Sequence, residues 1–338
     1  MTFNPGRQCL PCNLRLGRGS VFSVYIMPDL SIVIVNYNTC DLLRDCLHSL
    51  YQSQGEITFE VIVVDNASTD GSAAMVAGEF PQARLIASPV NGGFAYANNL
   101  GLKLAGFAVD GTPGEAAPRF ALLLNPDTVV PANGLAGMID FMEAHPEAGA
   151  AGPKLVRLDG SLDMACRRAF PTPAVSFYRM VGLSKLFPRS RIFGRYNMTF
   201  AEPDEMIEVD SVVGAFMLVR REAIAQAGLL DETYFMYGED IDWAYQIKRH
   251  GWKIYYNPAV TITHVKRAAS RSSGKAQIEF YRAMEIFYFK YYAGSTPFWL
   301  HGLILAGIRT QKWLTELKIG ANQPGGHNID QKSVEAAE

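Results

Sequence analysis

Apolar runs alternate with helical patterns over the first 124 residues. Runs of mainly apolar residues at 31–38, 59–65, 84–87 and 120–124 end in polar residues or are followed by them, which is typical of buried parallel strands. Between these runs, apolar side chains recur at helical spacing in 41–53, around Met75 and Val76, and in 94–106. This order of strands and helices predicts a doubly wound α/β half, whose ligands bind beyond the carboxyl ends of the strands.

The pattern after residue 200 is less regular. We expect a pair of strands within 209–220, helices at 222–228 and 239–250, short strands at 253–256 and 260–264, and helices at 278–292 and 298–318. The most apolar helix segment, 298–308, is too short to span a membrane and contains His301.

Composition narrows the class of protein. The 338 residues carry 31 Lys and Arg against 33 Asp and Glu, a net charge of −2, with 49% hydrophobic residues. This composition is typical of a folded protein, and it disfavours nucleic acid as a partner because a nucleic-acid coat needs a basic excess. Five cysteines form no disulfide framework, so we expect a reducing, cytoplasmic location.

Two clusters of polar residues follow strands. Asn125 and Asp127 come directly after the run 120–124, where a carboxylate can hold a divalent ion that neutralises a diphosphate, or can simply cap a turn. Asp65 ends the run 59–65, where it can accept hydrogen bonds from a base or a ribose, or belong to a plain turn. In addition, Gly92 and Gly93 open a helix, a place where backbone N–H groups can approach an anion.

Three carboxylates open the predicted helix 239–250. Glu239, Asp240 and Asp242 either complement the helix dipole or tune one member as a general base. His264, at the end of the run 260–264, is either a structural histidine or a metal ligand.

Eight motifs in order resemble the family 2 glycosyltransferases. They are VIVNYNT, VVDNASTDGS, NGGFAYANNLG, LLLNPDT, VVGAFMLVRREA, FMYGEDIDW, KRHGWKIYY and TITHV. The chain is most similar to the rhamnosyltransferase-like branch. The resemblance implies a GT-A type α/β fold, a mostly parallel Rossmann-like sheet flanked by helices. We therefore expect a flexible tail at 1–28, a GT-A domain at 29–270, a C-terminal helical extension at 271–320 and a disordered tail at 321–338.

The resemblance also implies roles for single residues. Asp240 is expected to be the catalytic base, with Glu239 and Asp242 beside it, and Asp127 and His264 are expected to hold Mg²⁺ or Mn²⁺. The expected nucleotide and donor-sugar contacts are Asn38, Asp65, Asn66, Gly92, Gly93, Asn98, Asn125 and Gly214.

The implied function is that of an inverting glycosyltransferase in cell-wall or polysaccharide biosynthesis. It would move a sugar, with rhamnose as the candidate, from a dTDP-, UDP- or GDP-linked donor to a hydroxyl of a glycan or lipid-linked acceptor. A non-catalytic nucleotide-sugar binding module of the same fold is the alternative. The three carboxylates Glu239, Asp240 and Asp242 disfavour it. An NAD-dependent oxidoreductase is disfavoured because the turn 36–41 contains no glycine.

A basic and aromatic segment follows the middle of the chain. Seven Lys and Arg residues lie within 167–195 among aromatic residues, and 164–201 contains no acid. Such a segment can contact an anionic membrane, hold a lipid diphosphate, or form a solvated loop. We expect Arg189, Arg191 and Arg195 to serve the acceptor or a peripheral contact with the inner face of the cytoplasmic membrane.

Overall fold

The computed structural model describes residues 27–265 and 274–321. The tails expected at 1–28 and 321–338 fall almost entirely outside the described residues, as does the boundary expected at 270/271 between the domain and its extension.

The first half of the chain confirms the predicted alternation. Its elements are β1 (Leu30–Asn36), α1 (Cys40–Tyr51), β2 (Phe59–Asn66), α2 (Ser72–Glu79), β3 (Arg84–Ser88), α3 (Phe94–Leu104) and β4 (Phe120–Leu124). Both faces of the central strands are buried, so their sequences are continuous apolar runs and not alternating ones.

The second half departs from the prediction at several elements. It contains β5 (Thr128–Val129), α4 (Gly134–Ala144), β6 (Ala148–Val156), α5 (Pro173–Met180), α6 (Leu183–Leu186), β7 (Ile207–Val209), β8 (Phe216–Arg220), α7 (Arg221–Ala227), α8 (Glu239–Arg249), β9 (Lys253–His264), α10 (Gly274–Tyr291) and α11 (Phe298–Ala321). The strands expected as a pair within 209–220 do not pair with each other, because β7 joins β9 while β8 lies between β4 and β6. The two short strands expected at 253–256 and 260–264 are one strand, β9, with a register shift opposite Pro153 and Lys154.

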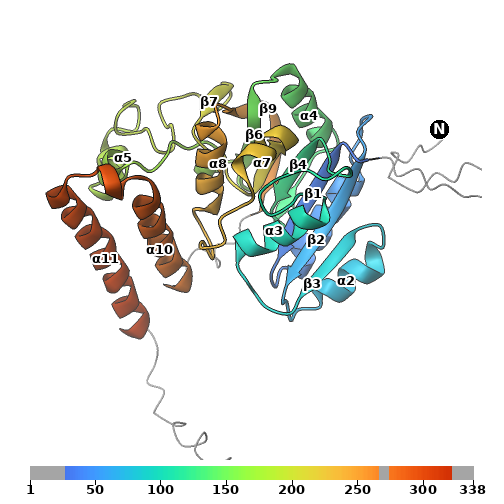
Figure 1. Cartoon of the computed structure of the whole chain (residues 1–338), viewed down its shortest axis with the longest axis horizontal. Coiled ribbons are helices and arrows are strands. Elements are labelled where there is room, and N and C mark those ends of the chain that lie inside the picture. The colour runs from blue at the N-terminus through green and yellow to red at the C-terminus, as the bar shows by residue number, and fades with distance from the viewer. Residues whose placement is uncertain (1–26, 266–273, 322–338) are drawn as a thin grey trace, which may run out of the picture.

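The strands form one mixed sheet in the order β3-β2-β1-β4-β8-β6-β9-β5, with β7 paired to β9 outside this path (Figure 1). Four of the pairings are parallel: β1 with β2 and β4, β2 with β3, and β6 with β9. Strand β8 runs antiparallel to both β4 and β6. In the register of β1 and β2, Asn36 lies opposite Asp65, so the polar ends of both strands meet at one edge. This edge is where the fold predicts ligand binding.

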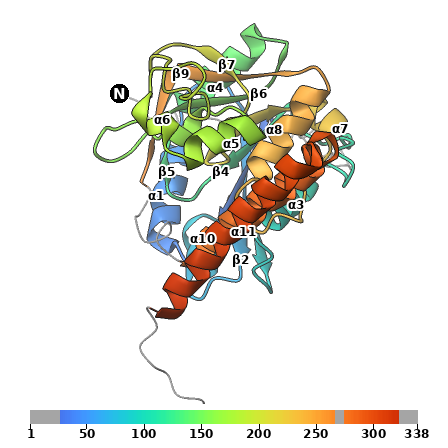
Figure 2. The same ribbon diagram turned by 90° about the vertical axis from the view of Figure 1, so that its left-hand side faces the viewer.

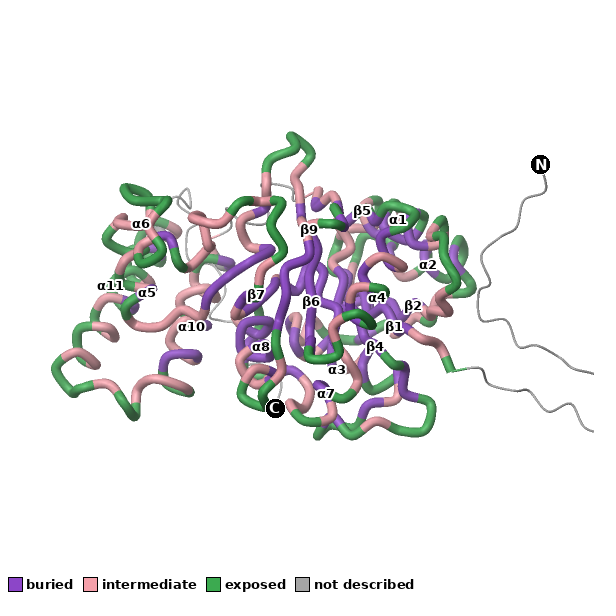
Figure 3. The backbone as a smooth tube through the Cα atoms, turned by 90° about the horizontal axis from the view of Figure 1, so that it is seen from above, coloured by how far each residue is buried: buried purple, intermediate pink, exposed green. Residues whose placement is uncertain are grey.

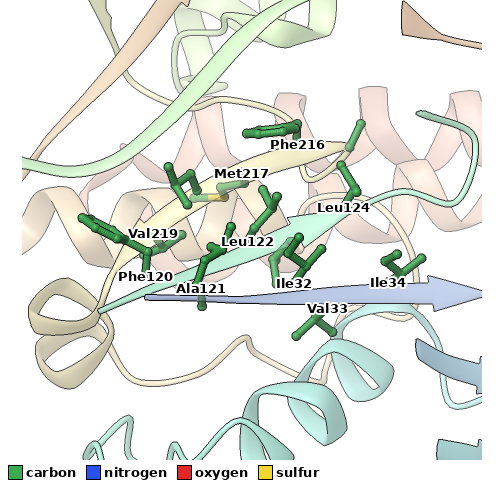
Figure 4. Packing of buried hydrophobic residues seen from close by; sticks show 14 of the residues in the cluster. Ile32, Val33, Ile34, Phe120, Ala121, Leu122, Leu124, Phe216, Met217 and Val219 are labelled. Carbon is green, nitrogen blue, oxygen red and sulfur yellow. The ribbon is translucent and has the colours of Figure 1, made fainter. Parts of the chain in front are cut away.

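Apolar side chains of three adjacent strands form the centre of the core. Ile32, Val33 and Ile34 of β1 pack beside β4 and β8, where Leu122 and Phe216 are almost completely buried (Figure 4). Figure 3 shows this continuous buried layer through the middle of the molecule. Each such side chain contributes about 1.5–3 kcal/mol by leaving water, which fixes the strands whose ends carry the site.

Helices α10 and α11 form a hairpin on the side of the molecule away from β3 (Figures 1 and 2). Arg309 of α11 donates hydrogen bonds to Glu285 of α10, and Tyr288 shares one with His301. No helix in the described part of the chain combines the length and apolar character that crossing a membrane requires.

Candidate active site

The ends of β1 and β2 are joined through Asp65, which is buried. Asn36 Nδ2 donates to Asp65 Oδ1 at 2.9 Å, and the backbone N–H of Ser68 donates to Oδ2 at 3.0 Å. Asn38, with a φ of 54°, accepts a hydrogen bond from the Thr69 N–H through its side chain at 2.8 Å. The two loops that follow these strands are therefore held together in one arrangement.

Asn66 orders the loop before α3. Its Nδ2 donates to Asn91 Oδ1 at 2.8 Å, and its Oδ1 accepts from the Gly92 N–H at 3.1 Å. Gly93 has a φ of 91°, and a Cβ there would collide with the carbonyl oxygen of Phe235. Only glycine permits both the positive φ and this close approach.

The expectation that Gly92 and Gly93 offer free N–H groups to an anion is wrong. The Gly92 N–H donates to Asn66, the Gly93 N–H to Asn91, and the Phe94 N–H to the carbonyl of Phe235 at 2.8 Å. These donors are used within the protein, and they bring the start of α3 against the segment that leads into α8.

The two neighbouring asparagines of α3 differ in their partners. Asn98 Nδ2 donates to the Phe94 carbonyl at 2.9 Å, while its buried Oδ1 has no hydrogen-bond partner among the described residues. Asn99, which the sequence did not single out, bonds to both the N–H and the carbonyl of Leu230. Asn99 therefore ties α3 to the loop before α8, whereas Asn98 contains a buried acceptor that no described residue satisfies.

Asp127 and His264 are brought together by the short strand β5. Thr128 lies opposite His264 in the antiparallel pairing of β5 with β9, and His264 Nε2 lies 3.2 Å from Asp127 Oδ1. The other ring nitrogen, Nδ1, lies 3.0 Å from Oδ2 of the buried Asp163. A carboxylate on the far nitrogen fixes the orientation of a histidine that ligates a metal.

These residues fit a divalent cation that is shared with a phosphorylated ligand. No group of three or more His, Cys, Asp and Glu side chains within 27–265 and 274–321 is arranged to hold a metal alone. Asp127 and His264 supply one oxygen and one nitrogen, and Mg²⁺ commonly takes only one or two carboxylates from the protein and the rest from phosphates and water. The donor set therefore suits Mg²⁺ or Mn²⁺ bound together with a diphosphate.

Asp240 is held by a buried ion pair at the start of α8. Its Oδ2 accepts from Arg168 Nη2 at 2.7 Å and from the Gly214 N–H at 2.9 Å. Arg168 also donates to the Val212 carbonyl at 2.7 Å. Burial lowers the pKa of Arg168, but the negative charge of Asp240 outweighs this effect, so the net shift of the pKa is upward. No hydrogen bond to Oδ1 of Asp240 is present in the described part of the chain, so that oxygen remains available to a ligand.

Adjacent residues of one loop join the part of the site around Asp127 to the part around Asp240. The Asn125 N–H donates to the Ala215 carbonyl at 3.0 Å, and the preceding residue, Gly214, contacts Asp240. A Cβ on Gly214 would lie 3.2 Å from the ring of Phe94, so α3 reaches the same place. The segments that carry Asp127 and Asp240 thus converge on residues 214 and 215.

The remaining two carboxylates of α8 have different surroundings. Burial, and next the negative charge of Asp240, raise the pKa of Glu239 to about 8, and its Oε2 has no partner among the described residues. Asp242 accepts hydrogen bonds at Oδ1 from Tyr291 at 2.7 Å and at Oδ2 from Lys290 at 2.9 Å. Glu239 is therefore a neutral acid beside Asp240 at neutral pH, whereas Asp242 fastens α10 to α8.

Sequence reasoning missed the partners of these groups. Asp163 and Arg168 lie 101 and 72 residues before His264 and Asp240, in a segment without regular periodicity. Arg168 and its neighbour Arg167 are both buried, and Arg167 donates to the carbonyls of Ala201 and Glu202. Two of the seven basic residues in 167–195 are therefore internal, a fact that only their tertiary contacts reveal.

Removing the positive charge of Arg168 is expected to destabilise the fold. In Arg168→Met the buried carboxylate of Asp240 keeps its charge and loses its partner, which costs about 3–5 kcal/mol. Urea denaturation followed by circular dichroism measures this loss. The double variant Arg168→Met/Asp240→Leu is expected to recover much of the stability, and a double variant as unstable as the single one would contradict the ion-pair explanation.

Comparison with known proteins gives the family. The family model described as Glycosyltransferase like family 2 matches residues 28–280. An N-acetylglucosaminyl-diphospho-decaprenol L-rhamnosyltransferase of Mycobacterium tuberculosis (strain CDC 1551 / Oshkosh) is 30% identical over 238 residues, which cover 70% of this chain and 76% of that protein. Rhamnosyltransferase WbbL of Escherichia coli (strain K12) is 26% identical over 249 residues, with 71% and 85% of the two chains covered.

Solved structures give the fold. Mannosyltransferase PcManGT from Pyrobaculum calidifontis, in complex with GDP-Man and Mn²⁺, aligns with a TM-score of 0.52 at 17% identity and covers 88% of this chain and 77% of its own. GalNAc-T7 with UDP, GalNAc and Mn²⁺ also aligns with a TM-score of 0.52, at 15% identity, over 88% and 58% of the two chains. The fold is therefore of the GT-A type, and the chain belongs to glycosyltransferase family 2, in which it is similar to the rhamnosyltransferases.

Proposed function

We propose that the protein is an inverting glycosyltransferase in which Asp240 is the catalytic base. The observation that carries this proposal is the hydrogen bonding of the Asp240 carboxylate. Arg168 and the Gly214 N–H both donate to Oδ2, and Oδ1 has no partner in the described structure. A carboxylate fixed through one oxygen can present the other to an acceptor hydroxyl.

The proposed step is a single displacement. The acceptor oxygen attacks the anomeric carbon from the face opposite the leaving group, a new C–O bond forms, and the bond from that carbon to the nucleoside diphosphate breaks. Asp240 Oδ1 takes the hydroxyl proton as the bond forms. The product therefore has the anomeric configuration opposite to that of the donor.

Asp127 and His264 are the residues that would hold Mg²⁺ or Mn²⁺ near the leaving group. A cation bound there supplies positive charge to the diphosphate, which stabilises the departing nucleotide. Asp163 holds the His264 ring in place through Nδ1, so its role is that of a positioning residue.

The nucleotide is proposed to lie at the ends of β1 and β2. Asp65 keeps lone pairs that can accept from a base N–H or a ribose hydroxyl, and Asn38, Asn66 and Asn125 border the same edge of the sheet. Asn98 and Gly214 are proposed to face the sugar, because both lie close to Phe94: Asn98 donates to its carbonyl, and a Cβ on Gly214 would lie 3.2 Å from its ring. Gly92 and Gly93 are proposed to act indirectly, since their N–H groups donate to the side chains of Asn66 and Asn91 and so hold the loop beside this edge in place.

The proposed donor sugar is rhamnose on a nucleoside diphosphate, with dTDP, UDP and GDP as the carriers to compare. The support is the similarity to two proteins that are named rhamnosyltransferases, one of them for an acceptor on diphospho-decaprenol. A glycan or lipid-linked saccharide is accordingly the proposed acceptor, used at the inner face of the cytoplasmic membrane.

A donor panel tests the proposal. We expect one nucleotide-sugar, with Mn²⁺, to raise the melting temperature more than its nucleotide alone and then to support transfer or slow donor hydrolysis. Binding without any turnover under the same conditions would favour the alternative, a non-catalytic nucleotide-sugar binding module of the same fold.

The raised pKa of Glu239 predicts a pH-dependent loss of stability. The folded protein keeps Glu239 protonated up to about pH 8, whereas the unfolded chain ionises it above its ordinary pKa of 4.5. The stabilisation is therefore fully present below pH 4.5 and is lost as pH rises through 8. Melting curves of Glu239→Gln, which cannot ionise there, should fall less between these limits than those of the unchanged protein; parallel curves would contradict the assignment.

A further inference from the structure

Helix α11 carries an apolar stripe on the side that faces away from the rest of the protein. Trp299, Leu303 and Trp313 are 58%, 64% and 56% exposed, and Leu317 continues their helical spacing. The opposite side of the helix is the one that packs, since Ile308 and Thr315 are buried. Apolar residues therefore lie on both sides of α11, whereas the usual amphipathic helix has a polar outer side.

The stripe continues onto α5 and α6. A Cβ on Gly307 of α11 would lie 3.5 Å from Met180 Cε, so α5 packs directly beside α11. Figure 2 shows α5 and α11 on the same side of the molecule. We call the exposed apolar residues of α11, of α5 and α6 and of the residues directly after α5 and α6 the apolar face; it comprises Phe177, Met180, Val181, Leu186, Phe187, Phe298, Trp299, Leu303, Trp313, Leu314 and Leu317.

Basic side chains border the apolar face without acidic partners. Lys185, Arg189, Arg191 and Arg195 are exposed, and none has a carboxylate within 4.0 Å in the part of the chain that the structure describes. Other exposed arginines differ in this respect: Arg84 is paired with Glu60 and Arg309 with Glu285, whereas Arg249 has no carboxylate within 4.0 Å among the described residues. Unpaired positive charge, together with an exposed apolar surface that includes two tryptophans, complements an anionic interface between water and hydrocarbon.

We propose that the apolar face docks on a bilayer that contains anionic lipids, with α11 lying in the plane of the headgroups. The 24-residue helix is about 36 Å long, and one side of it is occupied by the rest of the protein, so it can insert only its outer side chains. The basic residues at its border would meet the lipid phosphates.

Two other occupants fit the face less well. Residues 322–338 contain only Ile329 and Val334 as large aliphatic residues and no aromatic residue, so they offer little to cover two tryptophans. A second copy in a two-fold interface would place the unpaired positive charge of both chains in one interface without adding acidic partners, which is unfavourable.

The docked orientation connects the membrane with the active site through α10. Lys290 and Tyr291 of α10 bind Asp242, two residues from Asp240, and α11 is bonded to α10 through Arg309 and Glu285. The benefit for catalysis rests on the proposed function, because a lipid-linked acceptor would then be presented near Asp240. The docking itself does not depend on it.

Sedimentation of the full chain with vesicles tests the docking. We expect binding to vesicles of phosphatidylcholine with phosphatidylglycerol and much weaker binding to phosphatidylcholine alone. The triple variant Arg189→Gln/Arg191→Gln/Arg195→Gln should bind anionic vesicles about tenfold more weakly or worse. Its matched control, Arg84→Gln/Arg119→Gln/Arg221→Gln, removes the same charge far from the face and should bind normally.

A second pair of variants tests the apolar contribution. Trp299→Ser/Leu303→Ser should lose vesicle binding, whereas Val109→Ser/Leu158→Ser, which changes exposed apolar residues elsewhere, should not. Equal binding by all variants, or a change of sedimenting mass without lipid that points to a second copy, would overturn the proposal. Asp240→Asn should still bind vesicles, and the docking variants should still hydrolyse donor, so failure of docking and failure of the proposed activity are separate results.

Discussion

Asp240→Asn is expected to reduce glycosyl transfer by about 10²-fold or more, because a carboxamide cannot take the proton of the acceptor hydroxyl. Asparagine keeps the size of the side chain and can still accept from Arg168 and from the Gly214 N–H. Affinity for the nucleotide should change little, since the proposed nucleotide contacts lie at the ends of β1 and β2. Steady-state transfer and calorimetric titration with the nucleotide measure the two quantities.

Stability must be controlled in this experiment, since Asp240→Asn also leaves Arg168 without its counter-charge in a buried place. The double variant Arg168→Met/Asp240→Asn removes that unpaired charge. We expect it to melt at a higher temperature than the single variant and to remain inactive. If activity returned together with stability, Asp240 would be a residue that stabilises the fold and not the catalytic base.

Asp127→Asn is expected to weaken Mn²⁺ binding in the presence of nucleoside diphosphate. The rate of transfer is expected to fall by about the same factor as the affinity for Mn²⁺. The reason is that Asp127 supplies the only carboxylate in the pair it forms with His264. Electron paramagnetic resonance of Mn²⁺ in the presence of the nucleotide measures the binding without any turnover.

Asp163→Asn provides a graded comparison for the same site. It leaves both proposed ligands in place and removes only the charge on the far side of His264, so we expect a loss of about 10–100-fold in Mn²⁺ affinity. Unchanged Mn²⁺ binding in both variants would show that the cation, if it binds, is held elsewhere.

The parts of the fold that the sequence predicted are those with strong local patterns. The bounds of Phe120–Leu124 were predicted correctly, because five apolar residues in a row are typical of a strand that is buried on both faces. Strand β6 was missed because AGAAGPKLV is rich in small residues and contains a proline, and its burial depends on β8 and β9, far away in sequence.

The same distinction separates the site residues that could be predicted from those that could not. Asp127, Asp240 and His264 stand in short motifs at the ends of elements, where their residue types alone indicate chemistry. Asp163 and Arg168 have no such motif; their importance arises from contacts with residues 101 and 72 positions away, respectively. Likewise, helical spacing in 298–318 predicted α11, but not that its apolar stripe would face outward, because the direction depends on what packs against it.

The central claim is that Asp240 promotes a single displacement at the anomeric carbon. Proton NMR of the anomeric signal, recorded as the full chain transfers sugar from its best donor with Mn²⁺, tests it most directly. The account predicts a first-formed product whose anomeric configuration is opposite to that of the donor, formed about 10²-fold more slowly or worse by Asp240→Asn. A first product with the donor's own configuration would contradict it.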